Sequence, residues 1–257
     1  MRRLVAFSIF AAALTSLYIQ MHQARASNCA APQEIRFKIE RIIVRSVPGY
    51  TQGLVYRAGI LYESTGQYGD SSVNRINVQT GEVKSLYRLD QKYFGEGLEI
   101  WGNSRMLLTW KENTAFLWEG NSTGSPIIKT YPWEGWGLTH DSTLWITSDG
   151  TATVRFLDRD LKLKRTLQAE IEGKPQLGLN ELEYVNGKIY ANIYKTNQIV
   201  RINPQTGCVD QKLDISLLQT LDDPDSMPNG IAYDPLSDSF YIAGKKWQLI
   251  FQIKLLT

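Results

Sequence analysis

Five residues with chemically different side chains stand at nearly regular intervals along the chain. They open five similar phrases: Gln52-Gly53-Leu54, Glu96-Gly97-Leu98, Trp136-Gly137-Leu138, Asn180-Glu181-Leu182 and Asn229-Gly230-Ile231. A carboxylate, several amides and an indole, brought to one place, would form an apolar pocket that holds a few polar groups. Desolvation in such a pocket would raise the pKa of Glu96 and suit this carboxyl to proton transfer near neutral pH.

The spacing of the phrases predicts the elements that position these side chains. Successive phrases begin 44, 40, 44 and 49 residues apart, and a strand-rich repeat of about 40–50 residues is typical of one blade of a β-propeller. Equivalent positions of the blades converge on one axis, so we expect a site there. Residues that come just before or within a phrase, or that follow it on the next strand, complete the candidate set: Tyr50, Phe94, Trp110, Lys111, Glu181, Tyr194, Lys245 and Trp247.

Short segments rich in β-branched and aromatic residues, separated by turn residues, predict strands and hairpins within each repeat. Two of these segments, Asn74–Gly81 and Val200–Gly207, are nearly copies of each other. The fifth repeat ends one strand short, and Ile35–Val47, which precedes the first repeat, can supply the missing strand. We therefore predict an all-β fold, a five-bladed β-propeller closed by an N-terminal strand that completes the last blade and removes exposed sheet edges.

The first 26 residues predict a secretory signal peptide. Arg2 and Arg3 precede a mostly apolar run, and Ala24-Arg25-Ala26 fits the small-x-small pattern of a cleavage site. An uncleaved membrane anchor is the alternative, but the apolar run is short for a membrane span. We expect cleavage after Ala26, a secreted or periplasmic protein without a membrane partner, and a single propeller domain over residues 27–257.

Charge argues against nucleic acid as a partner. The whole chain has a formal charge of +2, and removal of the signal, which carries three arginines and no acid, leaves −1. The remaining Lys and Arg residues are scattered along the chain. No basic field is left to attract nucleic acid or an anionic membrane surface.

Several kinds of site are also disfavoured by residue type. Cys29 and Cys208 are the two cysteines, and the absence of a Cys-x-x-Cys or Cys/His cluster argues against zinc. In an oxidising compartment they could form a disulfide or remain unpaired thiols. His140 is the one histidine left after signal removal, which disfavours a Ser-His-Asp hydrolase. A structural calcium ion stays open at three aspartates near predicted turns, Asp70, Asp149 and Asp158.

Seven segments make the chain resemble the plant-type glutamine cyclotransferases, also called glutaminyl-peptide cyclotransferases. They are Tyr50–Leu54, Phe94–Leu98, Leu108–Lys111, Glu134–Thr139, Ser148–Thr151, Leu179–Glu183 and Ala243–Trp247. They follow the family's order over nearly the whole mature chain. The resemblance implies a five-bladed propeller that converts N-terminal glutamine to pyroglutamate and releases ammonia, with no cofactor required for catalysis. The implied partners are peptides or proteins with N-terminal glutamine, and we expect a monomer.

The resemblance also implies roles for individual residues. Glu96 would be catalytic, as the carboxylate that carries a proton from the substrate amine to the leaving nitrogen. Six residues would bind substrate: Gln52, Phe94, Trp110, Trp136, Asn180 and Lys245. Three positions depart from the family's pattern, which usually has phenylalanine at Tyr50, tryptophan at Tyr194 and proline at Gln248. Both aromatic positions keep a ring, so we expect altered substrate fit rather than lost activity.

The sequence leaves two other functions open. The first is a secreted propeller that binds peptides or glycans without catalysis. The second is a calcium-dependent lactonase-like propeller, which would require clustered metal-binding Glu, Asn and Asp side chains and usually six blades. Fold alone does not decide among these classes, because propellers serve both binding and catalysis.

Overall fold

The computed structural model describes residues 29–120, 124–219 and 225–256. The predicted signal peptide and its cleavage site lie outside the described residues. The described chain is all β, apart from one short 3-10 helix at Ser216–Leu218. Within this part of the chain, no helix is both long and apolar enough to cross a membrane.

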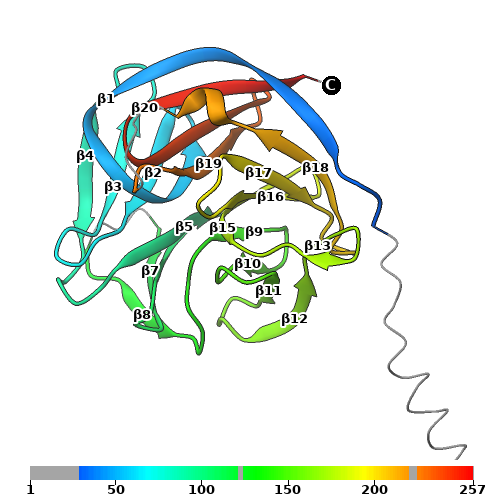
Figure 1. The fold of residues 1–257 in the computed structure, drawn as a ribbon. Helices are drawn as coiled ribbons and strands as arrows, with labels where there is room; N and C mark the ends of the chain where they lie inside the picture. Colours follow the sequence, from blue (N-terminus) through cyan, green and yellow to red (C-terminus); the bar gives the residue numbers. More distant parts are fainter. Residues whose placement is uncertain (1–28, 121–123, 220–224, 257) are drawn as a thin grey trace, which may run out of the picture.

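Antiparallel strands follow one another in five groups along the chain (Figure 1). Group 1 holds β1 (Gln33–Arg57), β2 (Ile60–Thr65), β3 (Ser72–Asn77) and β4 (Val83–Arg88). Group 2 holds β5 (Gly95–Trp101), β6 (Ser104–Thr109), β7 (Thr114–Glu119) and β8 (Ile127–Thr130). Group 3 holds β9 (Leu138–His140), β10 (Trp145–Thr147), β11 (Thr153–Leu157) and β12 (Leu163–Gln168). Group 4 holds β15 (Leu179–Val185), β16 (Lys188–Ile193), β17 (Gln198–Ile202) and β18 (Val209–Asp214), and group 5 holds β19 (Pro228–Asp234) and β20 (Ser239–Leu256). A separate two-stranded sheet is formed by β13 (Glu170–Ile171) and β14 (Lys174–Pro175).

The two ends of the chain lie side by side in group 5. The N-terminal part of β1 pairs antiparallel with the second half of β20, from Arg36 opposite Leu256 to Val44 opposite Leu249. The C-terminal part of β1 pairs with β2, and the first half of β20 pairs with β19. Figure 1 shows β1 in blue beside β20 in red. The predicted pairing of 35–47 with the end of the chain is present, although this segment is continuous with the first strand of group 1.

The first strands of the five groups contact one another in a ring. β1 contacts β5, β5 contacts β9, β9 contacts β15, β15 contacts β19, and β19 contacts β1. The approach is close enough that a Cβ on Gly53 would lie 2.3 Å from the Leu98 nitrogen, and one on Gly97 2.5 Å from the Leu138 nitrogen. Any larger residue at these two phrase positions would push neighbouring strands apart. The recurring glycine is therefore a packing requirement.

The ladder is irregular where four of the repeated phrases lie. Pairing shifts register between Thr51 and Gly53, Gly95 and Leu98, Leu179 and Leu182, and Pro228 and Ile231. A bulge removes a residue from the ladder and re-aims its side chain, and bulges are frequent beside active sites. At these phrases the strands therefore leave regular pairing, and their side chains point in new directions.

The hydrophobic core lies between neighbouring groups rather than within one of them. Five clusters of buried side chains occur among the described residues, and each combines two adjacent groups. In one cluster, Leu61 and Ile76 of group 1 pack with Ile250 of group 5. In another, Val73 of group 1 packs with Trp118 of group 2. Because burial of apolar area is the main stabilising term, the groups hold together by packing face to face.

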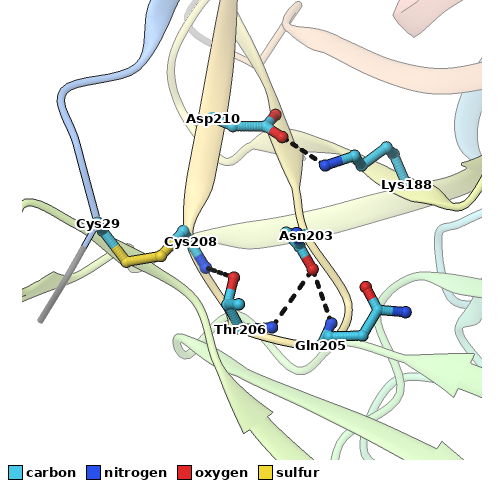
Figure 2. Close-up of a disulfide and its surroundings, with 7 residues drawn as sticks. All are labelled: Cys29, Lys188, Asn203, Gln205, Thr206, Cys208 and Asp210. Carbon is cyan, nitrogen blue, oxygen red and sulfur yellow. Dashed lines mark hydrogen bonds and ion pairs between the residues drawn. A yellow bond between two sulfur atoms is a disulfide. The ribbon is translucent and has the colours of Figure 1, made fainter.

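A disulfide joins the start of the described chain to group 4. Cys29 and Cys208 are bonded, with their Cα atoms 5.2 Å apart, and Figure 2 shows the bridge beside the turn that precedes β18. In this turn, Asn203 Oδ1 accepts hydrogen bonds from two backbone nitrogens, and Asn77 Oδ1 does the same in the matching segment of group 1. Of the two alternatives for the cysteines, the structure has the disulfide.

Loss of this disulfide is expected to destabilise the protein. The bridge spans 179 residues of sequence, and a cross-link over so long a loop restricts the unfolded chain strongly. The double variant Cys29→Ser/Cys208→Ser should lower the free energy of unfolding by about 2–5 kcal/mol, measured by urea denaturation. The reduced wild-type protein is the control and should match the variant. An unchanged unfolding midpoint would contradict the prediction.

Candidate functional site

One pocket collects the residues that were predicted to form the site. Its volume is about 170 Å³, and ten residues line it: Tyr50, Gln52, Gln67, Phe94, Glu96, Trp110, Trp136, Asn180, Tyr194 and Lys245. Glu96 and all six predicted substrate-binding residues are among them. The lining draws on every strand group. Four lining residues lie on strands of groups 1, 2, 4 and 5, and Trp136 lies just before β9 of group 3; the four are Gln52, Glu96, Asn180 and Lys245.

Glu96 is the buried carboxyl of this pocket. Its exposed fraction is 5%, and Gln52 Nε2 donates a hydrogen bond to its Oε1 at 2.9 Å. Within the described part of the chain, Glu96 Oε2 has no hydrogen-bond partner. Burial raises the pKa of this carboxyl well above its ordinary value; the Lys245 charge opposes the rise, and the charges of Glu112 and Glu134 add to it. A raised pKa brings a carboxyl closer to the range in which it can both accept a proton and return it.

Lys245 supplies a cation beside Glu96. Its exposed fraction is 5%, and its Nζ lies 5.1 Å from the centre of the Tyr50 ring and 5.4 Å from that of Tyr194. Both rings attract the ammonium through their π faces. Burial lowers the pKa of Lys245, while the charges of Glu96 and Asp225 oppose this effect. The two aromatic positions that depart from the family's pattern therefore flank the same ammonium.

The tryptophan walls of the pocket share one carboxylate. Trp110 Nε1 and Trp136 Nε1 donate hydrogen bonds to Glu134 Oε2 at 2.9 and 3.2 Å. Phe94 packs edge-on to Trp110 with ring centres 5.5 Å apart, and Tyr194 packs edge-on to Trp136 at 5.2 Å. Because Trp110 and Trp136 come from neighbouring groups, Glu134 fixes the relative orientation of two walls that the backbone alone would leave independent.

The backbone beside Gln52 is fixed by a buried ion pair. Arg45 Nη2 lies 2.9 Å from Glu63 Oε1, and the two side chains are 1% and 0% exposed. Thr51 Oγ1 donates a hydrogen bond to Glu63 Oε1 at 2.7 Å. Arg45 lies on β1 between two stretches that pair with β20, whereas Glu63 belongs to β2. The pair thus connects the part of β1 that lies against β20 to β2, which pairs with the segment of β1 around Gln52.

Asn180 is held through its backbone, which leaves its amide for the pocket. Ser148 Oγ donates a hydrogen bond to the Asn180 carbonyl oxygen at 2.6 Å and accepts one from the Gly137 nitrogen at 2.8 Å. One serine of group 3 therefore connects the third phrase to the fourth. The side chain of Asn180 lines the pocket without an anchoring role in the fold.

Some residues of the wider candidate set lie outside the pocket. Glu181 accepts hydrogen bonds from two backbone nitrogens of other groups. Trp247 is fully buried against Phe251, and Lys111 Nζ lies over the Trp110 ring. Conversely, Gln67 lines the pocket from an exposed turn, with φ of 92°. No repeat or motif in the sequence marks that position.

The three aspartates considered for calcium do not come together. Each forms an ion pair with a different basic residue, in the pairs Asp70–Arg88, Asp149–Arg155 and Asp158–Lys164. Among residues 29–120, 124–219 and 225–256, no three His, Cys, Asp or Glu side chains are grouped so that they could hold a metal ion.

One family profile and two known proteins with similar sequences carry the same activity in their names. The family profile of the glutamine cyclotransferases matches residues 10–255. A glutaminyl-peptide cyclotransferase of Arabidopsis thaliana is 36% identical over 214 residues, which cover 80% of this chain and 67% of the plant protein. The crystal structure of Myxococcus xanthus glutaminyl cyclase matches with a TM-score of 0.79 at 30% identity, over 87% of this chain and 98% of the bacterial one.

A more distant structure shares the fold alone. A Bacteroides thetaiotaomicron protein of unknown function matches with a TM-score of 0.53 at 11% identity, over 88% of this chain and 75% of its own. The sequence matches, by contrast, extend through all seven segments that line or surround the pocket. The chain belongs to the glutamine cyclotransferase family.

Proposed function

We propose that this glutamine cyclotransferase converts the N-terminal glutamine of peptides and proteins to pyroglutamate, with Glu96 as the proton carrier. The observation that supports the proposal most directly is the state of Glu96. It is buried, its pKa is raised, and one of its oxygens has no hydrogen-bond partner among the described residues, inside a pocket of amides, an ammonium and aromatic rings. One carboxylate can perform both proton transfers of the reaction, so the mechanism assigns no step to a cofactor.

The reaction joins the α-amino nitrogen of the substrate to its own γ-carboxamide carbon. The neutral amine attacks, and because its pKa is about 8, part of it is neutral near pH 7.5. The new C–N bond forms as the carbonyl electrons move to oxygen and produce a tetrahedral oxyanion. Glu96 takes the proton that the attacking nitrogen releases and gives it to the departing nitrogen. The oxyanion collapses, the old C–N bond breaks, and ammonia leaves.

The remaining pocket residues orient the substrate and stabilise the oxyanion. Lys245 and Asn180 offer hydrogen-bond donors, which are worth most where water is excluded. Gln52 keeps one Nε2 hydrogen for substrate after donating the other to Glu96. Trp110, Trp136 and Phe94 would fold the glutamine side chain toward its own amine. Such orientation is a large part of what an enzyme contributes to an intramolecular reaction.

We also propose that the five strand groups are the five blades of a propeller that β1 closes by completing the last blade. Two observations support this arrangement. The first strands contact each other in a ring, and every core cluster lies between two neighbouring groups, including groups 5 and 1. On this proposal residues 27–257 form one domain.

Secretion or export to the periplasm, after cleavage of the signal at Ala26, is part of the same proposal. The Cys29–Cys208 disulfide supports it, because disulfides persist mainly in oxidising compartments. Peptides and proteins with N-terminal glutamine are the proposed partners. We propose a monomer that binds neither nucleic acid nor membrane.

The carboxylate assignment has a direct mutational test. Glu96→Gln keeps the size and most contacts of the side chain but cannot carry the proton, so kcat/KM should fall by about 10²–10⁴-fold. The measurement is ammonia release from a Gln-initiated peptide. Glu99→Gln is the matched control, because Glu99 is a buried glutamate of the same strand that lies outside the pocket. Near-normal turnover by Glu96→Gln would refute the assignment.

The same assay separates the three candidate functions. We expect ammonia release that persists in the presence of a chelator. No release at all from the wild-type protein would favour a peptide- or glycan-binding propeller. Loss of ammonia release on chelation would favour the calcium-dependent lactonase-like propeller, provided that circular dichroism shows the fold intact after chelation.

The raised pKa of Glu96 gives a prediction for pH dependence. If the ionised carboxylate is required, kcat/KM falls as the pH drops through the pKa of Glu96. Glu134 raises this pKa through its charge. Glu134→Gln removes the charge and keeps an oxygen for the two indoles. The fall of kcat/KM on the acid side of the pH profile, called the acid limb below, should therefore move to lower pH by less than about one unit. With one substrate throughout, the amine contributes equally to both profiles. Glu82→Gln, an exposed carboxylate in a surface ion pair, should leave the limb in place.

A further inference from the structure

Asn229 opens the fifth repeated phrase but does not line the pocket. Its side chain is fully buried, with an exposed fraction of 0%. Asn229 Nδ2 donates hydrogen bonds to Gln52 Oε1 at 2.7 Å and to the Thr51 carbonyl oxygen at 3.0 Å. Gln52 Nε2 then donates to Glu96 Oε1 at 2.9 Å. These bonds form a chain from a backbone carbonyl, through two amides, to the carboxylate.

The Thr51 carbonyl oxygen determines which atom donates in each hydrogen bond of this series. The Thr51 carbonyl oxygen can only accept hydrogen bonds, so the end of Asn229 that faces it must be Nδ2. The end of Gln52 that faces Nδ2 must then be Oε1, and Gln52 must present Nε2 to Glu96. An amide is nearly symmetric in shape, and a glutamine without this contact could present either end. The backbone carbonyl removes that freedom.

The orientation of Gln52 has a chemical consequence for Glu96. A donor on Oε1 stabilises the ionised carboxylate. The reversed amide would place Oε1 of Gln52 against Glu96, and this contact is favourable only when the carboxyl is already protonated. A protonated Glu96 could not take the proton of the substrate amine. Among the described residues, Gln52 is the one hydrogen-bond donor to the Glu96 carboxylate.

We propose that Asn229 is a positioning residue, which holds the Gln52 amide so that Glu96 Oε1 always receives a hydrogen bond and Oε2 stays available to the substrate. This inference rests on the proposed function, in which Glu96 moves the proton. Asn229 touches neither the pocket nor the reacting atoms, and it acts through Gln52. Its own backbone is held in place by Asn192, whose Oδ1 accepts a hydrogen bond from the Gly230 nitrogen at 2.9 Å.

Other ionisable groups face Glu96 and set the background for any change. Lys245, from β20, favours the ionised form, whereas Glu112 and Glu134, from the segments after β6 and before β9, disfavour it. Three tyrosines also lie within electrostatic reach of Glu96: Tyr50, Tyr68 and Tyr131. All of these groups are unchanged in a variant at residue 229. A shift in the pH profile of Asn229→Ala, which adds no charge, therefore reports the orientation of Gln52.

The primary test is Asn229→Ala in the full mature chain. Without the anchor, the donor to Glu96 is no longer fixed, and the ionised form loses part of its stabilisation. We expect kcat/KM at neutral pH to fall about tenfold and the acid limb of its pH profile to move to higher pH. Asn203→Ala is the matched control: Asn203 is a half-buried amide that accepts two backbone hydrogen bonds in the turn before β18, outside the pocket. It should lower the melting temperature and leave the acid limb unchanged.

A double-mutant cycle tests whether Asn229 acts through Gln52. In the Gln52→Leu background no amide remains to be oriented, so adding Asn229→Ala should change kcat/KM by less than about twofold. The same tenfold loss in both backgrounds would overturn the proposal. A variant that loses stability yet keeps the wild-type kcat/KM and acid limb would overturn it as well.

A second substitution keeps the proposal testable if Asn229→Ala does not fold. Asn229→Asp preserves the size of the side chain, but its carboxylate accepts from Gln52 Nε2 and turns Oε1 toward Glu96. The acid limb should again move to higher pH, and by more than in Gln52→Leu/Asn229→Asp, where the added charge acts without a glutamine to turn. An equal shift in both backgrounds would overturn the proposal. The Glu96→Gln result keeps the two claims apart. An active Glu96→Gln refutes the proposed function, whereas an inactive Glu96→Gln with a normal Asn229 variant refutes this inference alone.

Discussion

The structure depends on how the backbone N–H groups of the five first strands find hydrogen-bond acceptors where these strands meet. Neighbouring first strands do not form regular ladders with each other, yet buried N–H groups need acceptors. Where a phrase carries glycine, the next strand comes close enough for a direct bond, as from the Gly97 nitrogen to the Trp136 carbonyl oxygen at 2.7 Å. The fourth phrase has Glu181 instead. Its carboxylate accepts from the Leu54 and Ile231 nitrogens at 3.1 and 2.8 Å, and so links three groups.

The role proposed for Glu96 requires a carboxylate that, unlike Glu181, is not used to accept hydrogen bonds from backbone nitrogens. Glu181 and Glu96 are both buried, and burial raises the pKa of both carboxyls. Glu181 commits one oxygen to each backbone nitrogen, and these two bonds oppose the rise in its pKa. Glu96 accepts one side-chain hydrogen bond, and its second oxygen has no partner within the described residues. An unsatisfied buried oxygen is costly for stability. Its presence in a pocket is the mark of a group kept for reaction.

The sequence predicted the pocket because its residues lie on the repeat itself. Glu96 and Asn180 occupy phrase positions, and a visible period was sufficient to bring them together. The roles of Asn229 and Glu134 could not be predicted in this way. The first depends on the orientation of an amide in another strand group, and the second on two indoles that converge from neighbouring groups. The spacing of the repeated phrases shows which positions are equivalent. It does not show which atoms of two side chains face each other. The cysteine pairing was undecided for the same reason.

The contacts that define the site are concentrated where the two ends of the chain meet. Asn229 and Gln52 are separated by 177 residues in sequence, and their bond crosses from group 5 to group 1. The Arg45–Glu63 ion pair and the β1–β20 ladder cross the same junction. A local opening there would separate Asn229 from Gln52 while the ladders of groups 2 and 3 stayed intact. On the proposed mechanism, the proton-carrying state of Glu96 is therefore coupled to the junction of the chain ends, and contacts that stabilise this junction also keep the carboxylate ready for reaction.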